Sequence, residues 1–262
     1  MSSYAQTFVP PTIATNEVLT AGAQLFVASL ASATSPRPLE PVVITFTADA
    51  AAASGDTSIS LTHNQASTAV IVRQGMILYF GAVKAVITAE TSIASGSSAT
   101  SVPVEALSAS IAEDATATSW NLLRVLSPSD IPNTSTDTMV DRKDLTFGLQ
   151  GSQVKVGTTF EPQVTVIRNP NERALDQIIY PASNGAQSIF AHIVYPGGLH
   201  VWGSTKVSNF TLPNAINEIQ RPQFTLNFQA PYARPTIFAF LSTAEKAVFN
   251  TVMQLSGLNT YS

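Results

Sequence analysis

The residues that could do chemistry are few and lie far apart in the chain. There are three histidines, His63, His192 and His200, and no cysteine. No H-x-x-x-H pair or carboxylate-bracketed pair gives the spacing of a zinc site, and no P-loop or G-x-S-x-G element is present. We interpret His192 as a packed strand residue and His200, after a Gly-Gly turn, as surface decoration. We therefore expect no enzyme activity, no metal and no cofactor.

One acidic stretch, "DTMVDRKD", could be imagined as a calcium loop. It brings together Asp137, Asp141 and Asp144 within eight residues. The spacing of an EF-hand, its central glycine and its closing glutamate are missing, and Arg142 and Lys143 lie among the acids. A solvated loop or an interface loop is the better interpretation.

Composition indicates a protein that is covered by other protein. Only 11% of the 262 residues are charged, against about 25% in an ordinary soluble domain. Because charge is depleted at the cores of interfaces, this favours an assembling protein, although low charge is also common in extracellular β-proteins.

Composition also argues against several partners. The net charge is −4, whereas binding to phosphate needs clustered Lys and Arg. The most apolar stretch, residues 69–89, contains Arg73 and Lys84 and does not predict a membrane span. The first residues lack the pattern of a secretion signal, so we expect a soluble protein made in a cytosol.

Alternation of apolar and polar residues predicts a mainly β body. In "QFTLNFQ", Phe224, Leu226 and Phe228 share one face, the period of two of a half-buried strand. "SIFAHIVYPGGLHVWGS" predicts a hairpin, "KVSNFTL" a further strand, and "QVKV" with "PQVTVI" an earlier pair. We expect a continuous antiparallel sheet system from Val154 to Leu226.

Two helices are expected beside the sheets. "RNPNERALDQIIYPASNG" predicts a helix that Pro181 should end, lined on one side by Leu175, Ile178 and Ile179. "STAEKAVFNTVMQLSG" predicts a second one, with a capping box at Ser242 and Glu245 and a stop at Gly257. Near-helical spacing gives that helix an apolar side formed by Val248, Val252 and Leu255.

Both ends of the chain carry apolar residues. Residues 1–40 read as a long N-terminal arm with one strand, "AQLFVASL", and the C-terminal stretch adds Phe238, Phe240, Phe249 and Met253. Because a monomer rarely exposes so much apolar surface, we expect both ends to pack across subunit boundaries. The alternative is that the helix folds back on its own subunit and the arm's strand belongs to its own sheet.

A low-complexity phrase occurs twice in the first half of the chain. "TADAAAASGDTSISL" begins at Thr47 and "TAETSIASGSSATSVPV" at Thr88. We interpret them as two copies of a β-unit that pack their apolar faces on each other, although such sequence can also resemble itself by chance. Residues 41–125 carry a net charge of −3, which favours a solvent-facing inserted domain at 41–125 in a body made of 1–40 and 126–262.

These phrases resemble the tail tube proteins of tailed bacteriophages. The two-copy unit, with "GMILYFG", "VITAE" and "ATSVPVEALSASIAEDATATSW", looks like the small β-insert of that family, and "WNLLRVLSPSDIPNTSTDTMVDRKDLTFG" like its acidic, Thr-rich exit loop. "TTFEPQVTVIRNPNERALDQIIYPASNG" resembles the family's strand and short helix. "AQSIFAHIVYPGGLHVWGSTKVSNFTL" and "RPQFTLNFQA" resemble its closing hairpin and last strand. The resemblance covers nearly all of the chain beyond the arm, but residues 231–262 depart from the family's shorter endings.

The resemblance implies a mainly β fold, with two packed antiparallel sheets in a tail-tube β-sandwich or barrel, a flanking α-helix and an outward-facing all-β insert. It also implies hexameric rings that stack into a hollow conduit for genome ejection in the virion tail. The partners would be the chain itself, tape measure, tail-tip or baseplate and tail terminator proteins, and a sheath if the tail is contractile. DNA would pass through the lumen without specific binding.

Within this expectation, the loop from Asn133 to Leu145 is the candidate contact between rings. It is long, Thr-rich and charged with both signs. Complementary charges across such a contact fix its register more than its affinity. The candidate residues are Asp137, Asp141, Arg142, Lys143 and Asp144.

Two other functions remain open. A capsid decoration or host-adhesion β-sandwich protein would also show an Ig-like insert with alternating Ser/Thr strands. A glycan-processing enzyme has only its mostly β fold in its favour, because glycosidases need two carboxylates at a defined separation and no acidic pair here is distinguished by its context.

Overall fold

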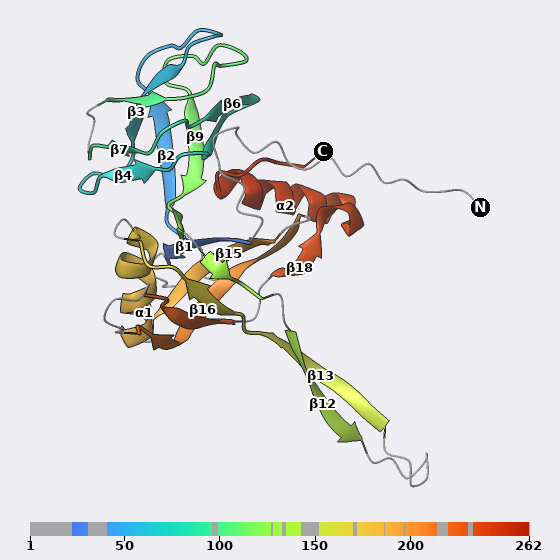
Figure 1. The fold of residues 1–262 in the computed structure, drawn as a ribbon. Coiled ribbons are helices and arrows are strands. Elements are labelled where there is room, and N and C mark those ends of the chain that lie inside the picture. The colour runs from blue at the N-terminus through green and yellow to red at the C-terminus, as the bar shows by residue number, and fades with distance from the viewer. Residues whose placement is uncertain are drawn as a thin grey trace.

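The computed structural model describes residues 23–30, 41–95, 99–126, 128–132, 135–142, 152–169, 172–185, 187–195, 198–213, 220–229 and 233–261. They form a central β body, an inserted β domain on one side of it and a two-stranded ribbon that projects from the other side (Figure 1). The prediction of a mainly β protein is confirmed.

The body is built on one eight-stranded antiparallel sheet. Its main path is β10 (Leu123–Arg124), β1 (Gln24–Ser29), β15 (Ser188–Tyr195), β16 (Leu199–Thr211), β17 (Gln223–Phe228), β14 (Gln163–Val166) and β11 (Pro128–Asp130). The long strand β16 pairs with β17 through its second half and with β18 (Ala233–Ile237) through its first.

The body sheet curls around a single apolar core. Leu25 of β1 and Val164 of β14 lie near opposite ends of the strand order, yet both are fully buried in the same cluster. That cluster also contains Phe224 of β17, the strand next to β14. A sheet whose two ends share one core must fold over on itself. One curled sheet therefore forms the body, where two packed sheets in a sandwich or barrel were expected.

The predicted hairpin is confirmed, whereas two other strand predictions differ from the structure. The predicted hairpin is β15 with β16, in register from Ser188 opposite Lys206 to Tyr195 opposite Leu199. "KVSNFTL" is not a further strand but the continuation of β16. "QVKV" lies in β13 (Ser152–Phe160), which pairs with β12 (Ser135–Arg142), whereas β14 pairs with β11 and β17.

The first predicted helix does not end at Pro181. A π-helical turn, η2 (Leu175–Ile179), leads directly into α1 (Tyr180–Gly185), which contains the proline. A proline ring normally clashes with the carbonyl four residues earlier, and the wider turn just before it relieves that contact. Leu175, Ile178 and Ile179 are buried, as their spacing predicts.

The inserted domain has a separate core and three small sheets. The largest has the order β8 (Thr100–Pro103), β3 (Ser58–His63), β2 (Val43–Ala48) and β9 (Thr116–Trp120). The others are β4 (Val70–Val72) with β7 (Thr91–Ile93), and β5 (Ile77–Phe80) with β6 (Val83–Val86). Its core residues run from Ile44 to Ala117.

The two similar phrases meet in an unexpected way. Their strands β3 and β8 are direct neighbours, with Ile59 opposite Val102 and Leu61 opposite Thr100. Backbone pairing therefore joins the copies edge to edge, and they do not pack face to face as expected. Ile59 and Val102 are buried on the same side of this sheet because paired residues in a ladder share a face.

The chain returns to the body earlier than residue 125. β10 pairs with β1, and Val125 is fully buried in the body core. The crossing therefore lies at Asn121 and Leu122, directly after β9.

The C-terminal helix packs on its own chain, so the expectation that it crosses to another subunit is wrong. A short 3-10 turn, η3 (Phe238–Phe240), precedes α2 (Thr243–Leu255). Phe249, Val252 and Met253 are buried against the body and the insert, while Val248, predicted to face inward, is 62% exposed. The helix begins with the predicted capping box at Ser242.

The arm's strand also belongs to its own sheet. β1 lies between β10 and β15 and pairs with β15 from Gln24 to Ser29. Its side chains are buried on both faces, because Leu25 and Val27 point into the body core and Phe26 and Ala28 contact α2. Residues 1–22 and 31–40 lie outside the described part of the chain.

One buried carboxylate gives the body a pH dependence that can be measured. Glu172, at the start of the helical segment, is 1% exposed, and its Oε2 accepts a 2.6 Å hydrogen bond from the Leu126 N–H. Burial raises the pKa of Glu172 from 4.5 to about 7, against the opposing effect of that N–H.

Replacing Glu172 with Gln should remove the contribution of this carboxyl to the pH dependence of the unfolding free energy between pH 4.5 and 7. In this range the unfolded chain has released the proton that the folded chain retains, so the free energy of unfolding falls as pH rises, by on the order of 2–3 kcal/mol. An amide does not ionise. Urea unfolding of wild type and Glu172→Gln across this range measures the difference; parallel curves would contradict it.

Candidate functional site

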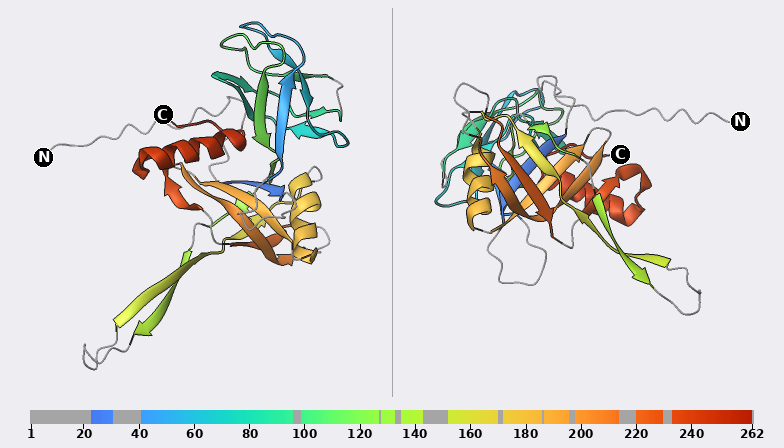
Figure 2. Two further views of the ribbon diagram at one scale, coloured as in Figure 1. Left: turned by 180° about the vertical axis from the view of Figure 1, so that it is seen from behind. Right: turned by 60° about the horizontal axis from the view of Figure 1, so that its bottom comes forward.

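The predicted ring-contact residues that the structure describes lie on the projecting ribbon. β12 and β13 pair with each other from Ser135 opposite Phe160 to Arg142 opposite Ser152, and both views in Figure 2 show them extending away from the body. The expectation of a loop over 133–145 is therefore wrong for its main part. The backbone of these polar residues is extended and pairs with β13, and the register shifts between Thr138 and Met139.

The structure places three of the five candidates. Asp137, Asp141 and Arg142 lie in β12, where Asp137 is opposite Thr158 and Asp141 opposite Gln153. Lys143 and Asp144 lie outside the described residues. The three described candidates thus share one strand, with Asp141 and Arg142 at the far end of the ribbon and Asp137 nearer its base.

A second polar cluster, which the sequence did not predict, lies inside the molecule. His192 Nε2 is 3.1 Å from His200 Nδ1. The other nitrogens contact two hydroxyls: His192 Nδ1 is 2.9 Å from Ser256 Oγ, and His200 Nε2 is 2.9 Å from Tyr261 Oη. His192 is fully buried and His200 is 2% exposed, so the interpretation of His192 as packed is confirmed and that of His200 as surface decoration is wrong.

This four-residue chain is satisfied only when the histidines are neutral or share one added proton. Each neutral imidazole donates through one nitrogen and accepts through the other. The hydrogen bonds can therefore all be donated in one direction, from Ser256 toward Tyr261, or all in the reverse direction. Two added protons would leave an N–H facing an N–H between His192 and His200. Burial lowers the pKa of both histidines, that of His200 to about 4, and Arg73 and His200 further disfavour charge on His192.

Two polar residues of the insert complete the cluster. Arg73 donates through Nη2 to the carbonyl of Ser256 and through Nη1 to that of Leu122 at 3.4 Å. Ser119 Oγ donates to the carbonyl of Leu255 at 2.8 Å. These donors satisfy carbonyls that the end of α2 leaves without partners in the helix, and a cation there is favoured by the helix dipole.

The cluster is enclosed by the protein. Ser256 and His192 have the contact of a nucleophile and its base, but both side chains are fully buried, so no substrate can reach the hydroxyl. Among the described residues, no group of three or more His, Asp or Glu could hold a metal ion. The third histidine, His63, ties β3 to β7 by donating to the Ile93 carbonyl at 3.2 Å.

One signal for the histidine pair was present in the sequence. In the predicted hairpin, Val194 lies opposite His200. His192 is two residues from Val194 and therefore on the same face, diagonal to His200, within reach of a long side chain. Ser256, Tyr261 and Arg73 could not be found this way, because they come from segments far away in sequence.

No helix in the described part of the chain is both long and apolar enough to cross a membrane.

The buried pair should make the protein less stable in acid. In the unfolded chain His200 titrates near 6.5, and in the folded chain near 4, so unfolding takes up a proton as pH falls through this window. The contribution of His200 to the free energy of unfolding is complete above pH 6.5 and falls by on the order of 3 kcal/mol by pH 4. His200→Gln should reduce this fall, because the amide keeps hydrogen-bonding atoms and does not titrate.

The measurement is the unfolding free energy at matched pH values. Glu172 acts in the opposite direction over part of the same range, so the informative quantity is the difference between His200→Gln and wild type at each pH. A difference that stays constant from pH 7 to pH 4 would show that His200 is not held neutral by burial.

No protein-family model matches the chain, and no curated protein sequence matches it.

Proposed function

We propose that this chain is a structural subunit of a bacteriophage tail tube, assembled as hexameric rings that stack into a hollow conduit for DNA ejection. The observation that carries the proposal is the β12–β13 ribbon. Its strands pair with each other and with no other described strand, and a lone two-stranded hairpin is at best marginally stable in water. A ribbon of this kind is expected to be covered in the working state, and a neighbouring copy supplies the cover.

The ends of the body sheet support sideways assembly. The outermost strands on its main path are β10, with two residues, and β11, with three. The outer side of an edge strand presents backbone N–H and C=O groups with which a strand of another chain can pair. Sheets of adjacent subunits that extend one another at these edges would close a ring and remove the exposed edges.

The outer face of the body sheet suits a channel for DNA. Ser208, Thr225 and Asn227 lie there, and Asn227 Nδ2 donates to Ser208 Oγ at 2.7 Å. Uncharged polar side chains offer phosphates little attraction, and Lys206 lies among them opposite Asn227. Because retention of DNA depends on the number of basic contacts, a wall of this composition lets DNA pass without specific binding.

In this proposal the protein is a part of the virion tail with no enzyme activity, made in the host cytoplasm. Its main partner is itself. Tape measure, tail-tip or baseplate and tail terminator proteins would meet the ends of the tube, and a sheath would surround it if the tail is contractile.

Electron microscopy of the purified protein tests both the assembly and the ribbon. Wild type should form rings or tubes, and a monomer that stays single at high concentration would contradict the proposal. Arg142→Glu with Lys143→Glu should leave a folded subunit that no longer elongates into tubes, because the charge pattern between rings is reversed. Arg221→Glu with Lys246→Glu, the same change of charge away from the ribbon, is the control and should still form tubes.

A capsid decoration or host-adhesion protein is the second candidate. The observation that favours it is that the insert has its own buried core and could present a binding surface independently. Deleting residues 41–120, which keeps β10 in place, separates the two functions by experiment. A tube subunit should retain ring formation seen by microscopy, whereas an adhesion protein should lose attachment to heads or cells in a sedimentation assay.

A further inference from the structure

The inserted domain is joined to the body by two neighbouring chain crossings. Leu30 and Pro41 form an antiparallel bridge where the chain enters, and the Asn121 N–H donates to the Val42 carbonyl at 3.2 Å where it leaves. Two strands that cross side by side define one axis. Without a further contact, rotation about this axis would be resisted only weakly.

A third connection comes from the end of the chain. After α2, the segment 256–261 runs along the insert. The Ile77 N–H donates to the Gly257 carbonyl at 3.1 Å. Tyr79 Oη donates to the Leu258 carbonyl at 2.8 Å and accepts from the Thr260 N–H at 3.2 Å, and Lys84 Nζ donates to Asn259 Oδ1 at 2.8 Å.

The same short segment is anchored in the body. Ser256 contacts His192, and Tyr261 contacts His200. The Tyr261 ring also packs against Phe238 and Phe249, with ring centroids 5.3 Å and 5.6 Å away. Six consecutive residues therefore hold the insert with one set of atoms and the body with another.

We propose that residues 256–261 are a clasp that fixes the orientation of the inserted domain on the body and turns a hinged connection into a rigid one. The contacts of the clasp with Tyr79 and Lys84 involve residues outside the two crossings, so they resist the rotation that the crossings allow. The inference concerns the subunit alone and holds whether or not the chain builds a tube.

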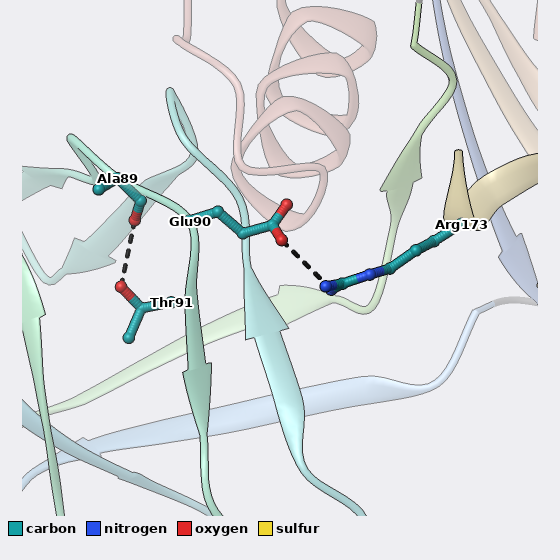
Figure 3. A network of polar contacts seen from close by, with 4 residues as sticks. All are labelled: Ala89, Glu90, Thr91 and Arg173. Atoms are coloured by element: carbon teal, nitrogen blue, oxygen red, sulfur yellow. Dashed lines mark hydrogen bonds and ion pairs between the residues drawn. The ribbon is translucent and has the colours of Figure 1, made fainter. Parts of the chain in front are cut away.

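An ion pair between the insert and the start of the helical segment is weak by comparison. Glu90 Oε1 and Arg173 Nη1 are 3.2 Å apart, and Figure 3 shows the two side chains reaching toward each other from the insert and the start of the helical segment. Their side chains are 56% and 45% exposed. Exposed pairs of this kind contribute little, so we assign the orientation to the clasp.

Gly257 offers a sharp way to open the clasp. Its φ is +64°, and a Cβ added there would lie 2.7 Å from Met76 Cγ and 3.3 Å from Arg73 Nη2. Gly257→Ala should therefore push the segment away from the insert. Gly81→Ala is a matched control, because Gly81 has a φ of +62° and open space around its Cβ position. It introduces a similar backbone strain in the β5–β6 turn, and its added Cβ contacts no atom of the segment 256–261.

The readout is a distance between the two parts, and the absence of native cysteine makes labelling direct. Spin labels at Ser110→Cys in the insert and Gln177→Cys in the body report it by pulsed electron resonance. Wild type and Gly81→Ala should give one narrow distribution, and Gly257→Ala a broadened or shifted one. A broad wild-type distribution, or a narrow and unchanged one in Gly257→Ala, would overturn the clasp.

A second variant keeps the test decisive if Gly257→Ala does not fold. Tyr79→Phe retains the ring and removes both hydrogen bonds of its hydroxyl to the segment. It should broaden the distance distribution, whereas Glu90→Gln, which removes the exposed ion pair, should leave it as in wild type. If Glu90→Gln broadened the distribution and Tyr79→Phe did not, the orientation would be fixed by the ion pair and not by the clasp.

Discussion

The burial of Phe249 against the body hairpin is the contact on which the rest of the structure depends. Its ring packs in edge-to-face contact with His200 and Trp202 at centroid distances of 5.1 Å and 5.3 Å. Val252 and Met253 extend the same surface toward Phe26, Trp120 and Phe190. These partners come from the N-terminal strand, the last insert strand and the body hairpin, so one helix unites segments that are distant in the chain. Burial of large aromatic side chains is the largest single source of such stabilisation.

This third core explains a feature of the body strands. β1 and β15 are buried at successive positions, from Leu25 to Ala28 and from Ile189 to Ile193, and do not alternate as half-buried strands do. One face of each strand covers the body core and the other is covered by α2. The helix therefore shields Phe26 and Phe190 from solvent. The C-terminal apolar residues Phe249 and Met253, which were expected to contact another subunit, are buried within the chain. Phe240 remains 82% exposed.

The polar residues inside this core fix the register in which the end of the chain packs on the body. A purely apolar contact tolerates sliding, whereas a hydrogen-bonded chain from Ser256 through His192 and His200 to Tyr261 is satisfied at one register only. Leaving any buried member without a partner carries a desolvation cost. Neutral histidines suit this position because each offers one donor and one acceptor and no charge to bury. The same atoms that position the end of the chain thus make it sensitive to acid.

Local chemistry decided what the sequence could determine alone. Period-two alternation gave β17, the hairpin turn gave β15 and β16, and the Ser242 and Glu245 capping box marked the start of α2, because each depends on residues close together in the chain. The mainly β class and the separate character of the insert followed from the same patterns. Pairing partners did not, since β13 has equal local reason to join β14 or β12.

Only the tertiary structure decided which face of α2 is buried, where β3 meets β8, and what surrounds the histidines. Val248 and Phe249 are neighbours on the helix, yet one is largely exposed and the other is 1% exposed, because the choice depends on where the body and the insert lie. Likewise, Arg73, His192 and Tyr261 come from three distant segments. A sequence determines the elements through short-range chemistry, but contacts between distant segments exist only once the fold has brought them together.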